Sequence, residues 1–136
     1  MKEPIWIDEQ DALTIHERLL LRHGGAGGVR DQRLLESALA RPRQLYAYGD
    51  APDLIDMAAA YTVGIVRNHP LVDGNKRAGF VVGVLFLELN GQDFVASEAE
   101  AAVAVLELAA GTLDQSGFAA WLRDNVRKGR PRKGHR

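Results

Sequence analysis

The feature that most constrains the fold is an uninterrupted apolar run, AGFVVGVLFL, from Ala78 to Leu87. The run is well short of the roughly 20 apolar residues that a membrane-spanning helix needs. A helix with no polar face is normally the buried centre of a bundle. The run follows Asn75 and is closed by Asn90 and Gly91, so we expect a central helix that starts near Asn75 and is covered by other helices.

Two further helices are predicted before this run. Apolar residues recur at helical spacing over 8–23, with Asp8 as the expected N-cap. The glycine-rich segment GGAGGVRD follows; it lacks the lysine of a phosphate-binding P-loop, and we interpret it as a flexible connection. Asp31 is the expected N-cap of a second helix, which we expect to end before Pro42 because the residue before a proline is disfavoured in the α region.

Three more helical segments are predicted, one before the apolar run and two after it. The stretch over 54–67 is strongly helical and should stop near His69, again because proline follows. Ser97 and Glu100 form a capping-box pattern ahead of another helix. An amphipathic pattern over 113–126 predicts the last one.

Signals for strands are few. They are limited to IWI near the start, the LYAY stretch over 45–48 and QDFVA over 92–96. Residues 43–50 suit a short hairpin or loop. We therefore predict an all-α bundle with at most a small β flap, as a single domain over 1–126 followed by a basic tail over 127–136.

The composition limits the classes of protein to consider. A chain of 136 residues with 46% hydrophobic and 26% charged residues fits one globular domain. The absence of cysteine excludes disulfides and cysteine metal sites. The start shows no signal-peptide pattern, so we expect a soluble cytoplasmic protein with no membrane role. The last ten residues hold six lysines and arginines and no acid; we expect a disordered, solvated tail, with nucleic-acid phosphates as its alternative partner.

The loop before the apolar run, NHPLVDGNKRAGF, is the candidate site. Lys76 and Arg77 stand where the positive end of a helix dipole repels cations. Unpaired N–H groups at a helix start bind anions, and a glycine such as Gly74 lets a ligand approach the backbone closely. We interpret Gly74, Asn75, Lys76 and Arg77 as a binding site for a polyphosphate.

Two further residues of the loop suggest chemistry. Asp73 is placed to hold a magnesium ion that bridges phosphate oxygens. His69, as a neutral imidazole, is able to accept the proton of an attacking hydroxyl group. Taken singly, each residue has an ordinary structural interpretation, for example an Asp-Gly turn or a solvated cation. Their combination before a buried helix favours a phosphate-transfer site.

The residues His69 to Arg77, HPLVDGNKR, resemble the signature of the Fic superfamily in its death-on-curing (Doc) form, written H-x-F-x-[DN]-[AG]-N-K-R. The likeness extends to HERLLLRHGG, GVRD, LLESALARPR and AAAYTVGIVRNHP, which occur in the same order as in Doc-like chains. This resemblance implies a mostly helical Fic fold and the toxin of a type II toxin–antitoxin system. It also implies a protein kinase that transfers the γ-phosphate of ATP, with Mg²⁺, to a threonine of elongation factor Tu and so arrests translation.

The resemblance also implies a role for each residue of the loop. His69 would be the base, Asp73 would help to hold magnesium, Gly74 and Asn75 would line the phosphate loop, and Lys76 and Arg77 would neutralise the phosphates. The LYAY stretch falls where the family has a flap that docks the target, which would involve Tyr46 and Tyr48. No [ST]-x-x-x-E-[GN] inhibitory helix is found in the sequence, so restraint is expected from a separate Phd-like antitoxin that folds on the toxin surface.

One departure and two alternatives qualify this interpretation. Leu71 stands where the family usually has Phe, and a leucine fills an apolar pocket with some loss of contact area. The first alternative is a Fic-type AMP transferase, which Lys76 and Phe80 disfavour because those enzymes have Gly and Arg at the matching positions. The second is a non-catalytic module in which the loop holds a nucleotide and the basic tail binds nucleic acid.

Overall fold

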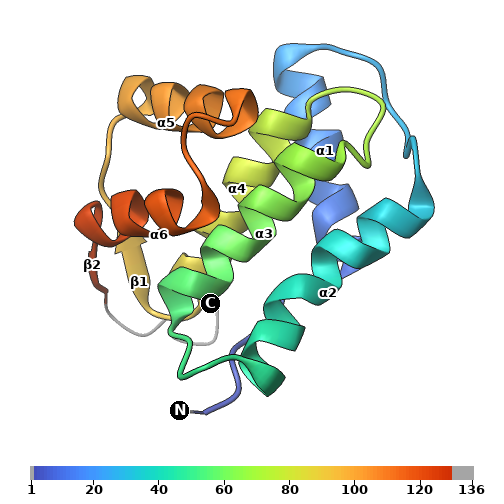
Figure 1. Cartoon of the computed structure of the whole chain (residues 1–136). Coiled ribbons are helices and arrows are strands. Elements are labelled where there is room, and N and C mark those ends of the chain that lie inside the picture. Colours follow the sequence, from blue (N-terminus) through green and yellow to red (C-terminus); the bar gives the residue numbers. More distant parts are fainter. Residues whose placement is uncertain (1, 130–136) are drawn as a thin grey trace.

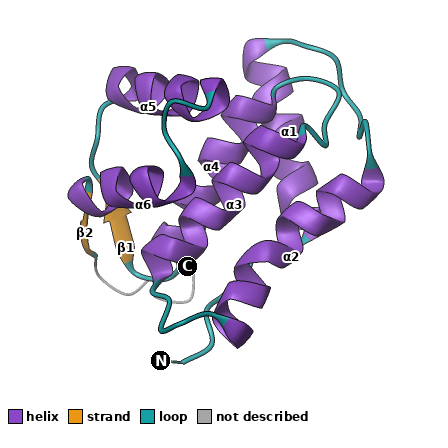
Figure 2. Ribbon diagram, in the orientation of Figure 1, coloured by secondary structure: helices purple, strands orange, loops and turns teal. Residues whose placement is uncertain are grey.

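The computed structural model describes residues 2–129, which fold into six helices and a two-stranded sheet (Figures 1 and 2). The predicted all-α bundle with a small β element is confirmed. The helices are α1 (Glu9–His23), α2 (Gln32–Tyr48), α3 (Leu54–Asn68), α4 (Asn75–Leu89), α5 (Glu98–Ala110) and α6 (Gln115–Asp124); the strands are β1 (Gln92–Phe94) and β2 (Val126–Lys128). Within this part of the chain, no helix is long and apolar enough to cross a membrane.

The centre of the bundle is a pair of helices, α3 and α4. The predicted central helix is α4, but α3 is the more deeply buried of the two, with every residue over 57–66 inaccessible to solvent. Two glycines of α4 allow close contact: a Cβ on Gly79 would lie 3.2 Å from the carbonyl oxygen of Thr62, and one on Gly83 would lie 3.1 Å from that of Ala58. The Thr62 hydroxyl also donates a hydrogen bond to the Gly79 carbonyl oxygen at 2.8 Å.

The helix α2 packs against the other side of α3 and continues through Pro42, so the predicted end before Pro42 is wrong. A proline inside a helix costs about 3 kcal/mol because it removes one backbone hydrogen bond and crowds the preceding turn. Burial offsets that cost. Pro42 is itself buried, Leu45 packs on the core, and the ring of Tyr46 meets that of Trp6 edge to face at 5.6 Å.

The same finding overturns the assignment of LYAY to a flap. These residues form the last turn of α2. The loop over 69–74, which joins α3 to α4, is called the motif loop below. The first turn of α2 lies beside it, because the amide of Asp31 donates to the Pro70 carbonyl oxygen at 3.0 Å. A helix of 17 residues is about 25 Å long. Tyr48 therefore lies at the far end of the helix from the candidate site.

The small sheet joins β1 and β2 in antiparallel register, with Gln92 opposite Lys128 and Phe94 opposite Val126. The strand signal in QDFVA is thus confirmed over Gln92–Phe94. β2 was not predicted, and it contains the first two residues of the segment expected to be a disordered tail, Arg127 and Lys128. Residues 130–136 of that segment lie outside the described residues.

The IWI stretch near the start is not a strand. Its last residue, Ile7, is held by Tyr61 of α3: the Ile7 amide donates to the Tyr61 hydroxyl at 2.9 Å, and that hydroxyl donates to the Ile7 carbonyl oxygen at 3.1 Å. Burial raises the pKa of Tyr61 to about 12. This bond pair ties the N-terminal segment to the central helix in front of α1.

Candidate active site

The loop over 69–74 joins the two central helices and begins at His69. This residue ends α3 with φ 50° and ψ 53°, in the left-handed region, and it precedes a proline. A residue other than glycine is uncommon in this conformation and costs of order 1–3 kcal/mol there. The side chain of His69 is exposed. The loop thus presents an imidazole to solvent from a backbone position that the surrounding structure must maintain.

Asn75, the first residue of α4, holds the loop from inside. It is 6% exposed. Its Oδ1 accepts a hydrogen bond from the Leu71 amide at 2.9 Å, and its Nδ2 donates to the Leu71 carbonyl oxygen at 2.9 Å. These two bonds fix the orientation of the amide, so that Nδ2 also faces Nδ1 of His69, at 3.3 Å.

Leu71 anchors the loop in the core at 4% exposure. It also forms an isolated antiparallel bridge with Val29, which lies in the segment before α2. The leucine therefore occupies the buried position that the family motif assigns to phenylalanine. The departure changes the size of the anchor, and Leu71 is buried.

The start of α4 has no side-chain cap. Its N-cap is Gly74, with φ 77° in the left-handed region, and within residues 2–129 it has no side-chain cap hydrogen bond. Lys76 and Arg77, in the first turn of α4, are exposed. Three features that the sequence predicted thus occur together at one helix start: a glycine, open N–H groups and two cations. Such a start attracts anions.

Asp73 is exposed, and its carboxylate is held from two sides. Oδ1 accepts from the Gly74 amide at 2.8 Å, and Oδ2 accepts from the Ala26 amide at 3.3 Å. Gly25, at φ 115°, has no room for a side chain, because a Cβ there would lie 2.7 Å from Oδ2 of Asp73. The glycine-rich segment thus packs on the motif loop, and it is more than the flexible connection that we expected.

The donor set around Asp73 fits a magnesium ion shared with a nucleotide. Within residues 2–129 there is no group of three or more histidine or acidic side chains able to hold a metal by themselves. Magnesium is commonly bound by one or two carboxylates together with substrate phosphates and water. A single exposed carboxylate next to an anion-binding helix start matches that pattern.

Two residues in contact with the loop were missed by sequence analysis. His16 of α1 is 3% exposed, and its Nε2 lies 2.8 Å from the Asp73 carbonyl oxygen. It shares a buried face with Ala12, one turn earlier, and that spacing was the available signal. Arg30 donates from Nε to the His69 carbonyl oxygen at 2.6 Å and from a terminal nitrogen to that of Asn68 at 2.9 Å. No local pattern marks Arg30.

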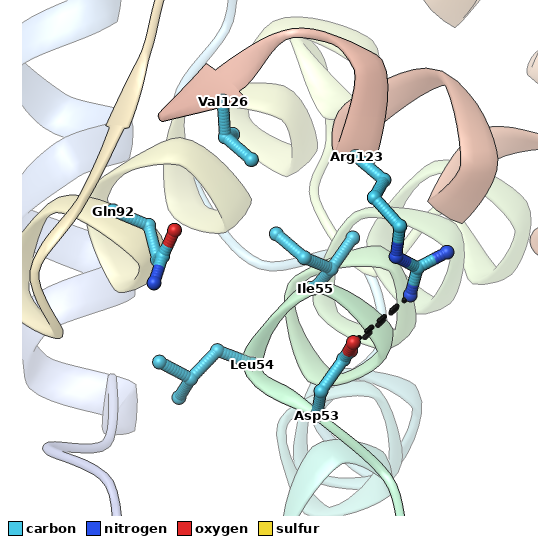
Figure 3. Close-up of a pocket in the computed structure, with 6 residues that line it drawn as sticks. All are labelled: Asp53, Leu54, Ile55, Gln92, Arg123 and Val126. Atoms are coloured by element: carbon cyan, nitrogen blue, oxygen red, sulfur yellow. Dashed lines mark hydrogen bonds and ion pairs between the residues drawn. The ribbon is translucent and has the colours of Figure 1, made fainter. Parts of the chain in front are cut away.

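An open groove of about 400 Å³ lies elsewhere, at the start of α3 (Figure 3). With 15 residues, α3 is about 22 Å long, so the groove and His69 are at opposite ends of the same helix. The figure shows Arg123 reaching across to Asp53, an ion pair of 3.1 Å. The lining is otherwise mostly apolar and contains none of the motif residues; it comprises Asp53, Leu54, Ile55, Gln92, Arg123 and Val126.

Known proteins share this sequence pattern. Residues 6–87 match the model of the "Fic/DOC family", which covers more than half of the chain and all of the motif loop. The chain is 40% identical over 92 residues to "Toxin Doc" of Mycolicibacterium smegmatis, across 67% of this chain and 68% of that protein. It is 31% identical over 117 residues to "Protein kinase doc" of Escherichia phage P1, across 86% of this chain and 92% of that protein.

Proposed function

The chain belongs to the Fic/DOC family, and from that premise we propose that it is the toxin of a type II toxin–antitoxin pair and acts as a protein kinase. Its substrate is ATP, and its target is a threonine hydroxyl of elongation factor Tu, so the protein acts in the cytoplasm by arresting translation. The observation that carries the proposal is the uncapped start of α4, where exposed Lys76 and Arg77 lie in the first turn and an exposed His69 begins the short loop before it.

The proposed reaction is a transfer of the γ-phosphoryl group. A bond forms between the acceptor oxygen and the γ-phosphorus, the bond from that phosphorus to the β,γ-bridging oxygen breaks, and ADP leaves. The hydroxyl proton passes to a ring nitrogen of neutral His69. Lys76, Arg77 and the first-turn N–H groups of α4 neutralise the phosphate oxygens. A magnesium ion held by Asp73 would add positive charge at the same oxygens.

The AMP-transferase alternative gains no support from the contacts of Phe80. This residue stands where AMP-transferring Fic motifs have a second arginine. Its ring is partly buried and packs edge to face on Phe94 at 5.4 Å. It therefore offers no charge to a phosphate and belongs to the packing between α4 and β1.

Control of the proposed activity falls to a partner. The sequence has no built-in inhibitory motif, and the imidazole and the two cations of the loop are exposed. We propose that a Phd-like antitoxin segment folds on the toxin surface and restrains it.

The test uses purified elongation factor Tu, Mg²⁺ and ATP labelled on either the α- or the γ-phosphate. The proposal expects label from γ only, and a loss of about 10²- to 10⁴-fold in the His69→Ala variant. His23→Ala is the matched control, because His23 is an exposed histidine at the end of α1. Label from α would establish AMP transfer instead. Nucleotide binding without transfer of either label would favour the non-catalytic module.

A further inference from the structure

We propose that Arg30 is a positioning residue for the reaction, which keeps the backbone of His69 in its left-handed conformation. The inference rests on the proposed function, in which His69 is the base. It concerns a side chain that lies in the segment between α1 and α2, 39 residues before His69 in the chain.

The contact itself is strong and specific. The guanidinium donates from Nε to the His69 carbonyl oxygen at 2.6 Å and from a terminal nitrogen to the Asn68 carbonyl oxygen at 2.9 Å. Both are charge-assisted bonds to the last carbonyls of α3, where the helix dipole is negative. A fork on two successive carbonyls restrains the two peptide groups on either side of the His69 Cα, and so the direction in which the His69 side chain leaves the backbone.

The backbone around Arg30 strengthens this hold. The amides of Arg30 and Asp31 both donate to the Pro70 carbonyl oxygen, at 2.7 and 3.0 Å, and the Val72 amide donates to the Gly28 carbonyl oxygen at 3.0 Å. The segment over 28–31 therefore lies along the motif loop, joined to it by these bonds and by the isolated bridge from Val29 to Leu71. Arg30 is the residue of this segment that contacts the loop with both its backbone and its side chain.

His69 needs such a restraint. Its conformation is unfavourable for a residue other than glycine, and its ring is exposed, with a 3.3 Å contact from Asn75 to orient it. The opposite end of the loop has a comparable tie, from His16 to the Asp73 carbonyl oxygen. His16 is buried, so its replacement would disturb the core, whereas Arg30 is exposed and can be changed with less effect on folding.

The first experiment compares Arg30→Ala and Arg30→Lys with Arg33→Ala, a matched change of an exposed arginine in the first turn of α2. We expect Arg30→Ala to lower kcat for γ-phosphate transfer by about 10- to 100-fold, because a small misplacement of a catalytic group has effects of that size. Arg30→Lys should restore little, since an ammonium lacks the planar fork. The Kd for ATP, set by α4, should stay within about twofold in every variant. An unchanged kcat in Arg30→Ala would overturn the inference.

A double-mutant cycle distinguishes positioning of His69 from a general loss of structure. In a His69→Ala background, Arg30→Ala should change the residual transfer rate by less than about twofold, because the group it positions is gone. A further 10-fold loss in that background would show that Arg30 acts by another route and would contradict the inference.

The NMR signal of the His69 ring separates failure of the inference from failure of the proposed function. If the wild-type chain transfers no label, the proposed function is wrong, and the ring signal alone then decides about Arg30. We expect Arg30→Ala to shift and broaden the His69 Cε1–H resonance and Arg33→Ala to leave it in place. A resonance unchanged by Arg30→Ala would overturn the inference whatever the activity.

Discussion

The starts of α3 and α4 differ in their side-chain caps and in the charge of their first turns. The carboxylate of Asp53 accepts from the Asp56 amide at 2.8 Å, the Asp56 carboxylate accepts from the Asp53 amide at 3.0 Å, and Arg123 adds an ion pair. α4 instead begins at Gly74, without a side-chain cap and with two cations in its first turn. The other four helices resemble α3, with an aspartate or serine N-cap: Asp8, Asp31, Ser97 and Asp114.

The difference supports the proposal that the start of α4 binds a phosphate ligand. Its helix remains stable because other contacts hold it: Asn75 is bonded to Leu71 on both sides, and the Thr62 hydroxyl is bonded to Gly79 one turn further along. Tertiary packing thus compensates for a missing cap. The helix start therefore remains uncapped, with two exposed cations in its first turn.

The largest effect is expected from Lys76→Glu. The carboxylate should repel the nucleotide phosphates, and γ-phosphate transfer should fall by about 10²-fold or more. The same change should raise the free energy of unfolding by about 0.3–1 kcal/mol, because an acid is favoured at a helix start. Labelled transfer and urea unfolding measure the two effects, with Lys76→Gln as the control for simple loss of charge. Undiminished transfer would remove Lys76 from the site.

Nucleotide should supply the negative charge that α4 lacks and so stabilise the fold. A non-hydrolysable ATP analogue at about 100 times its Kd should raise the free energy of unfolding by about 2.7 kcal/mol. Thermal unfolding with and without the analogue and Mg²⁺ measures this. The shift should disappear in Lys76→Glu and persist in Asp53→Ala; equal shifts in all three proteins would place the nucleotide elsewhere.

A smaller effect is expected at the start of α3. Asp53→Ala removes the cap and should lower the free energy of unfolding by about 0.5–2 kcal/mol. The kcat for phosphate transfer should not change, because Asp53 lies at the opposite end of α3 from His69. Asp53→Asn keeps a capping side chain and should recover most of the loss. A large drop in kcat in folded Asp53→Ala would mean that the groove in Figure 3 takes part in function.

The smallest effect concerns acid. Burial alone would raise the pKa of Asp53, but hydrogen bonds from Asp56 and Arg123 outweigh it and hold that pKa below its ordinary value of 3.8. A carboxyl group with a lowered pKa in the folded state adds stability above about pH 4, and this is lost as the pH falls through the folded pKa. The free energy of unfolding of the wild type should therefore exceed that of Asp53→Asn by less than about 1 kcal/mol at neutral pH. Urea unfolding should show this difference shrinking as the pH is lowered; a difference that stays constant with pH would contradict the expectation.

Features with local causes were predictable from the sequence. The caps at Asp8, Asp31 and Ser97 follow from hydrogen bonds within four residues, and the uncapped cationic start at Asn75 stood out against them. Features that depend on contacts far along the chain were not.

The missed features are of that second kind. Pro42 ends a helix by local rules, yet α2 continues because the residues after Pro42 pack on Trp6 and the core. His16 and Arg30 reach loop residues that are 57 and 39 positions away. Their roles depend on how α1 and α2 dock, which no local pattern describes.

The hydrogen bonds from His16 and Arg30 to the loop also bear on the order of folding. Contacts between residues far apart in sequence form late, because closing a long loop costs entropy before any contact compensates for it. The α3–α4 hairpin has only a short connection and can form early. We therefore expect the hairpin to assemble first and the loop to take its final shape only when the N-terminal third of the chain docks. If folding follows that order, the chain would gain the proposed activity in the last step of folding, and an agent that blocks docking of α1 would leave a helical but inactive protein.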